Sequence, residues 1–364
     1  WNDIFGGCDS VEAYWNAFCA VLDFALANCV RRYKQRGLQC NFPLSPTTRQ
    51  ALAFKKHLWN RFKFSGSIQY KIRHRRMSKR CHDLVIKDRR THENSLSQNR
   101  ELNKFYKYVK SVLKRETAIP AISDYNGSLV HDDVAKCSIF NAQYSRVFVK
   151  DSGDRPPFPP RTCHTLDDVH FSAAVVLRSL RRVSNTLARG PDGYASVFIR
   201  GIADNIVEPL NTIFTVCFYF GTLPRVWLDA HIIPVYKRKG SVTCASNYRP
   251  IALTSVISKV MERCVRDSML DHLIRHRLIS PHQHGFLPQR STLTQMIEML
   301  NGWVDSLENG DAIDAIYFDL AKAFDTVVHR KLLQKCVAYG FKGHLYAYIQ
   351  SFILNRRQRV VINA

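Results

Sequence analysis

A fifteen-residue stretch, residues 311–325 (DAIDAIYFDLAKAFD), constrains the fold of this 364-residue chain more than any other. Apart from Asp314, residues 312–318 are apolar on both faces, which predicts a short, buried central strand. The strand would end at Asp319, and a helical pattern begins directly after it. A carboxylate there is costly unless it is paired, capped or bound to a cation. Asp319 is therefore expected either to cap the following helix or to bind magnesium at the floor of a cleft.

Positive charge is concentrated in the first third of the chain. The formal net charge is +23, and residues 31–115 hold 24 Lys and Arg against 4 Asp and Glu. Charge on this scale indicates a polyanionic partner, most simply a nucleic acid. The alternative is a solvated, partly disordered linker.

Aromatic residues are interleaved with these cations over a predicted helical region from about 48 to 114. Cations neutralise phosphates and exposed rings stack on bases, although helical aromatic residues also pack in cores. The cations that we expect to contact nucleic acid are Arg73, Arg75, Arg76, Lys79 and Arg80.

Hydrophobic periodicity predicts a mixed helix and strand chain. The stretch 151–160 is proline-rich and predicts a linker, the strongest internal boundary. Further helices are expected over residues 11–35, 132–144, 166–180, 199–220, 255–274, 292–307, 329–339 and 344–354. A hairpin is expected over 122–130. Residues 230–240 are expected to form a strand that runs into a basic turn, and further strands are expected over 247–253 and 359–362.

Six motifs from residue 187 onward resemble, in order, the reverse transcriptases of non-LTR (LINE-type) retrotransposons. They are GPDG (190–193), WLDAHIIPVYK (227–237), NYRPIAL (247–253), SKVME (258–262), QHGFLPQRST (283–292) and FDLAKAFDTVVH (318–329). The resemblance implies an α+β right-hand polymerase, with fingers over 187–308 and a palm that begins near 311. Before it we expect a mainly helical basic region over 1–120 and an extension over 121–186.

The resemblance also assigns roles to individual residues. Asp319, with the backbone carbonyl of Leu320, would bind one or both of two Mg²⁺ ions. Arg249, Lys259 and Phe324 would bind the nucleotide, with Phe324 as a steric gate for deoxynucleotides. The residues expected to contact template and primer are Gln283, Gly285, Phe286, Arg290 and Ser291.

Some of these roles have structural alternatives. Phe324 could simply pack in a core, and Lys237, Arg238 and Lys239 are as compatible with a solvent-facing turn as with phosphate binding. Asp325 is expected to be structural, as a helix cap or a turn partner.

The aromatic-x-Asp-Asp motif that supplies the second pair of catalytic carboxylates in the family is absent from the sequence. Because the chain begins at Trp1 and ends at Ala364 within a predicted strand, we expect a fragment of a longer product that cannot polymerise DNA alone. The predicted function is RNA-directed DNA polymerase. The alternatives are a non-catalytic RNA-binding remnant of a decayed element and, more weakly, a protein similar to group II intron maturases.

The expected partners are an RNA template, a DNA primer and deoxynucleoside triphosphates. No run of 18 apolar residues predicts a membrane span, and the 11 cysteines show no spacing suited to zinc. We therefore expect reduced thiols in an intracellular protein. The resemblance adds a nuclear site of action, at chromosomal DNA.

Overall fold

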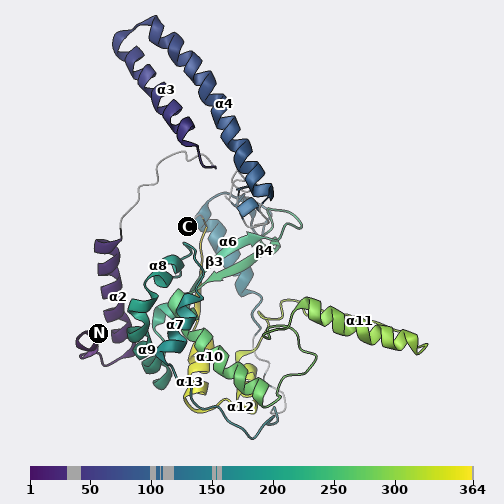
Figure 1. The fold of residues 1–364 in the computed structure, drawn as a ribbon. Helices are drawn as coiled ribbons and strands as arrows, with labels where there is room; N and C mark the ends of the chain where they lie inside the picture. The colour runs from purple at the N-terminus through teal and green to yellow at the C-terminus, as the bar shows by residue number, and fades with distance from the viewer. Residues whose placement is uncertain are drawn as a thin grey trace. The chain divides into compact units, whose positions relative to one another are not determined.

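The computed structural model describes residues 1–30, 42–98, 104–106, 108–109, 119–149, 153 and 158–362 (Figure 1). These form two compact units, one within residues 30–118 and one built from residues 1–29 and 119–364. The architecture combines helices with small sheets, which confirms the α+β class. The boundaries at 120 and 186 stay predictions, and residues 151–157 of the expected linker lie, apart from Gly153, outside the described ranges.

The unit within residues 30–118 is a helical hairpin of α3 (Pro46–Ser65) and α4 (Ile68–Gln98). Ser45 caps α3 by accepting a hydrogen bond from the backbone N–H of Thr48, and Pro46 occupies the first turn, where its missing N–H costs nothing. The helix ends at Gly66, whose φ of 64° is the left-handed conformation that glycine adopts readily. The predicted helical region over 48–114 is therefore broken into two antiparallel helices up to Gln98, and most of residues 99–114 lie outside the described ranges.

The second unit has a helical core around α9 (Ala203–Tyr219). This helix packs against α2 (Val11–Cys29), α7 (Ala173–Arg181) and α13 (Gly343–Ile353). Trp227 is fully buried at the centre, with its ring centroid 5.2 Å from that of Trp15 in α2 and 6.1 Å from that of Phe214 in α9. A short helix, α1 (Asn2–Phe5), precedes α2.

Two predicted helices begin or continue differently in the structure. The helix expected over 166–180 starts only at Ala173, because Leu166 pairs in parallel with Phe341 and Ser172 caps the helix. The helix expected over 199–220 is two helices, α8 (Ser196–Gly201) and α9, which meet at Ile202, where φ and ψ leave the helical region.

A three-stranded sheet in the order β4-β3-β5 lies beside this core. β3 (Asp229–Tyr236) is antiparallel to β4 (Tyr248–Leu253) and parallel to β5 (Arg357–Val360). Two short 3₁₀ helices, Arg225–Trp227 and Ala245–Asn247, precede β3 and β4. α6 (Asp133–Ser145) covers the sheet, with the buried ring of Phe140 edge-on to Tyr248 at 5.0 Å.

The remaining predicted elements are confirmed within a few residues. The hairpin is β1 (Ile122–Ser123) paired with β2 (Leu129–Val130), turning at Gly127. The helices are α10 (Val256–Arg275), α11 (Thr292–Glu308) and α12 (His329–Ala338). Among the residues that the structure describes, no helix combines the length and the apolarity needed to span a membrane.

The predicted central strand over 312–318 is wrong in this structure. Residues 311–320 have no regular secondary structure, residues 321–326 form turns rather than a helix, and residues 314–327 are all exposed. A two-faced apolar strand needs hydrogen-bonding neighbours and cover on both faces. The described sheet of β4, β3 and β5 pairs with no part of this stretch.

α11, which leads into the same stretch, is equally uncovered and extends away from the helical core (Figure 1). Its apolar stripe falls at helical spacing as predicted, yet the helix has no buried residue. Both 292–308 and 311–327 therefore present apolar side chains that the described chain does not cover.

Candidate nucleotide and template site

The first motif, GPDG (190–193), is docked on the corner between β4 and α10. A Cβ atom on Gly190 would lie 2.5 Å from the carbonyl oxygen of Thr254, so only glycine fits this approach. The Ser255 hydroxyl donates a 2.6 Å hydrogen bond to Asp192 and accepts one from the backbone N–H of Ser258, which caps α10. Burial raises the pKa of the Asp192 carboxyl, although the Ser255 bond opposes the rise.

Arg249 lies on β4, opposite Val235 of β3, with its side chain exposed. It lines a groove of about 340 Å³ together with Lys237, Lys322 and Asp325. The last two belong to the motif at 318–329, so the fold brings this turn to the strand that carries Arg249. Lys237 is held by a 2.6 Å hydrogen bond from its Nζ to the carbonyl of Ser246.

Lys259 is exposed on the first turn of α10 and lines a different, wider groove of about 640 Å³. Phe286 of the motif at 283–292 lines the same groove, together with Tyr348 of α13. The structure therefore places Lys259 beside Phe286 of the loop expected to contact the template, while Arg249 faces the turn at 321–326.

The loop over residues 283–291 is held on α11 by a polar cluster. His284 is buried, its Nε2 lies 2.8 Å from Oε2 of Glu298, and Nδ1 of His282 lies 2.6 Å from Oε1 of the same carboxylate. These hydrogen bonds hold the pKa of Glu298 below its usual value, that from His282 having the larger effect. Arg290 reaches the cluster, with its Nη1 3.1 Å from His284 and 3.5 Å from Glu298.

The cluster also ties the loop to the start of α11. Nδ1 of His284 lies 2.9 Å from the hydroxyl of Thr294. That hydroxyl donates to the carbonyl of Ser291 and accepts from the backbone N–H of Ser291. The buried imidazole is thus connected to the residues that cap the helix.

Sequence reasoning did not identify His282, His284 or Glu298 as loop-positioning residues. The sequence offered only a weak signal for this cluster. A His-x-His pattern precedes Ser291, which caps α11, and Glu298 follows one helical turn after Thr294. Of the predicted loop residues, Ser291 caps α11 and Gln283 donates a 3.0 Å hydrogen bond to the carbonyl of Gly285.

Phe286 and Phe324, assigned to template and nucleotide by resemblance, are in contact. Their ring centroids are 6.0 Å apart at an interplanar angle of 84°, an edge-to-face pair. Both rings are otherwise exposed, by 89% and 78%, and Phe286 has a φ of 64°, which is uncommon for a bulky residue. A strained, exposed aromatic residue of this kind is typical of binding loops.

Asp319 and Leu320 lie in the exposed stretch and not at the end of a strand. No group of three His, Cys, Asp or Glu side chains suited to a metal ion occurs within the described ranges. The described residues therefore do not by themselves assemble a two-magnesium site, and no catalytic step through such ions follows from this structure.

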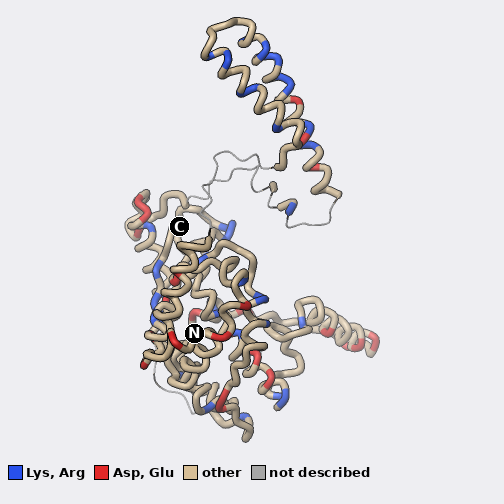
Figure 2. The backbone as a smooth tube through the Cα atoms, turned by 60° about the vertical axis from the view of Figure 1, so that its left-hand side comes forward, with Lys and Arg blue, Asp and Glu red and all other residues tan. Residues whose placement is uncertain are grey.

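Five cations predicted to contact nucleic acid, called the α4 cations, are all exposed on helix α4: Arg73, Arg75, Arg76, Lys79 and Arg80. Figure 2 shows Lys and Arg along both helices. Among the aromatic side chains of the hairpin, Phe64 is 91% exposed, whereas Trp59 is tilted against Phe62 and His74 at centroid distances of 5.5 and 5.0 Å. The hairpin thus offers exposed cations and at least one free ring.

Comparison with known proteins adds an independent observation. Residues 236–363 match the family "Reverse transcriptase (RNA-dependent DNA polymerase)". The RNA-directed DNA polymerase from mobile element jockey of Drosophila melanogaster is 29% identical over 192 residues, which are 51% of this chain and 21% of that protein.

Two further relatives agree. A probable RNA-directed DNA polymerase from transposon BS of Drosophila melanogaster is 24% identical, over 50% of this chain and 20% of the relative. The jockey polymerase of Drosophila funebris is 22% identical, over 96% of this chain and 40% of the relative. The chain spans between a fifth and two fifths of these relatives, and its similarity is to RNA-directed DNA polymerases of mobile elements.

Proposed function

We propose that this chain is part of an RNA-directed DNA polymerase that copies RNA into DNA by nucleotidyl transfer. The observation that carries the proposal is the family match over 236–363, which includes Arg249, Lys259 and Asp319 in the order of the resembling motifs. In this role the planar guanidinium of Arg249 would make bidentate hydrogen bonds to the triphosphate, and the ammonium of Lys259 would act on it as a point charge. Phe324 would stand against the sugar, and Phe286 against the template.

The same proposal assigns Mg²⁺ as the cofactor, with Asp319 as one hard-oxygen ligand. Because Asp319 is exposed and the described residues form no metal-binding group, we propose that residues 1–364 alone do not polymerise. The uncovered apolar side chains of α11 and of residues 314–327 support an incompletely assembled palm.

A second candidate function is RNA binding without catalysis. It is favoured by the hairpin α3–α4, where α4 alone holds nine Lys and Arg against three Asp and Glu. Such a surface binds phosphates without regard to sequence, and its affinity falls steeply with salt. RNA binding by itself is compatible with both candidates, so the two must be separated at the nucleotide site.

The test uses ultraviolet cross-linking of radiolabelled dTTP to the purified chain in the presence of an RNA template and a DNA primer, followed by primer extension. We expect labelling of the wild type, weaker labelling of Arg249→Gln and Lys259→Gln, and no extension. If both variants were labelled as strongly as the wild type, the result would contradict the polymerase proposal, and RNA binding without catalysis would be the remaining candidate. If the wild type extended the primer and Asp319→Ala abolished that extension, the result would confirm the polymerase. It would also contradict the proposal that residues 1–364 alone do not polymerise.

A further inference from the structure

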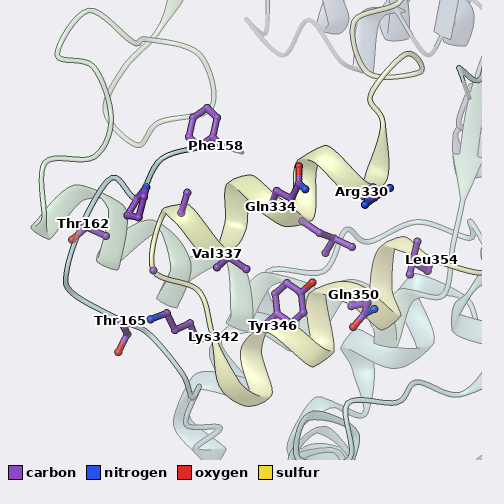
Figure 3. Close-up of a pocket in the computed structure, with 14 residues that line it drawn as sticks. Phe158, Thr162, Thr165, Arg330, Gln334, Val337, Lys342, Tyr346, Gln350 and Leu354 are labelled. Atoms are coloured by element: carbon purple, nitrogen blue, oxygen red, sulfur yellow. The ribbon is translucent and has the colours of Figure 1, made fainter. Parts of the chain in front are cut away.

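A third groove, of about 630 Å³, lies between residues 158–165, α12 and α13 (Figure 3). Backbone hydrogen bonds build its wall: the N–H of Arg161 donates to Ala338 at 2.8 Å, and that of Leu166 donates to Gly340 at 2.8 Å. Gly340 has a φ of 89°, and a Cβ there would lie 2.2 Å from the carbonyl oxygen of His164. The groove is therefore a fixed feature of the fold.

Among the described residues that line this groove, the charges have one sign. Arg330 and Lys342 lie at opposite ends of it, as Figure 3 shows, and none of the described lining residues is Asp or Glu. Within the described ranges neither cation forms an ion pair. The nearby Asp167 accepts a hydrogen bond from Thr165 at 3.5 Å and does not line the groove.

Additional cations surround its aromatic rim. The ring of Phe158 has the guanidinium of Arg161 at 5.0 Å and the ammonium of Lys335 at 5.3 Å from its centroid. Residues 326–364, which contain both helices, hold seven Lys and Arg and no Asp or Glu. The local potential therefore favours an extended anion over a neutral ligand.

The remaining lining groups match the chemistry of nucleotides. The half-buried ring of Tyr346 can stack on a base beside the Phe158 ring, and the amides of Gln334 and Gln350 can donate to and accept from base edges. We propose that this groove binds one strand of nucleic acid, with phosphates on Arg330 and Lys342 and a base against an aromatic wall. Neither Asp319 nor Arg249 lines it, so the site is additional to the proposed nucleotide site.

The test is photocross-linking of a 12-nucleotide single strand that carries 5-iodouridine, as RNA and as DNA, to the full chain. Cross-linked peptides are then identified by mass spectrometry. We expect adducts on Phe158 or Tyr346, at least five-fold fewer in Arg330→Gln/Lys342→Gln, and unchanged adducts in Arg178→Gln/Arg182→Gln. The control pair removes two exposed cations from α7 and its C-terminal cap.

Two further measurements keep the outcome decisive. A single strand releases about 0.7 counterion per neutralised phosphate. The double variant Arg330→Gln/Lys342→Gln should therefore lower the slope of log binding constant against log salt concentration by about 1.4. Gln350→Glu, which adds a negative charge to the groove, should reduce the adducts as well. Adducts confined to the hairpin α3–α4, or adducts displaced by a poly-glutamate peptide at equal charge concentration, would overturn the proposal.

Discussion

The docking of Gly190 on Thr254 allows a sharp prediction of stability. In Gly190→Ala the new methyl group would lie 2.5 Å from the Thr254 carbonyl oxygen, 2.7 Å from its carbon and 2.8 Å from Cα of Ser255. All three are backbone atoms, so a rotamer change cannot relieve the overlap. Overpacking of this kind costs about 1–3 kcal/mol. If the turn separates from the corner instead, the Ser255–Asp192 bond is broken, which destabilises the fold by a further amount of about 1.5–3 kcal/mol.

The assay is urea unfolding followed by tryptophan fluorescence, in a Trp59→Phe/Trp303→Phe background so that Trp15 and Trp227 dominate the signal. Gly201→Ala is the matched control, since nothing lies within 4 Å of its Cβ position and alanine suits a helix better than glycine. We expect a lower free energy of unfolding for Gly190→Ala and an equal or higher one for Gly201→Ala.

A double-mutant cycle with Ser255→Ala separates the two routes. If Gly190→Ala separates the turn from the corner, adding Ser255→Ala removes only the cap of α10, about 1 kcal/mol. If the corner holds and the backbone is strained, the two costs add. Equal stabilities of Gly190→Ala and Gly201→Ala would refute the docking itself.

Three other predictions concern charge. Because burial raises the pKa of Asp192 above its unfolded value near 3.8, folding stability should fall as pH rises from about 4 through the folded pKa, and Asp192→Asn should flatten that slope in pH-dependent unfolding. Glu298→Gln should speed tryptic cleavage at Arg290 at neutral pH while Glu308→Gln does not, and because the pKa of Glu298 is lowered, the amides of the wild-type loop should keep their protection from hydrogen exchange as pH falls, until that carboxylate is protonated below the usual range of a glutamate. Replacing the α4 cations by glutamine should lower the salt slope for single-stranded RNA by about 0.7 for each phosphate that the helix no longer neutralises, and an unchanged slope would place RNA binding elsewhere.

Prediction from the sequence succeeded where the deciding interactions are local. The Ser291 cap and the apolar spacing of α11 are both encoded within a few residues, and the helix bounds were confirmed. The turn at Gly127 likewise depends on its own left-handed backbone and on two hydrogen bonds to the Asp124 carboxylate.

Prediction failed where partners distant in the sequence decide. Residues 312–318 have the composition of a central strand, but strand formation needs neighbours that the described chain does not provide. The start of α7 was placed seven residues early because the pairing of Leu166 with Phe341 is invisible in local periodicity. The cluster of His284 and Glu298 was missed because polar pairs across a loop leave no periodic pattern.

The candidate site contains both residues that the described fold positions and a residue that it does not position. Arg249 and Lys259 lie on β4 and α10, whose corner is fixed by Gly190 and the Ser255–Asp192 bond, so the chain itself positions these two cations. Asp319, in contrast, lies in the exposed stretch that nothing in the described chain covers. The groups proposed for phosphate binding are therefore ordered by the fold, whereas the group proposed for metal binding is not. It follows that nucleotide binding and nucleotide incorporation should be separable in this chain, which is why the proposed function is tested by both measurements on one preparation.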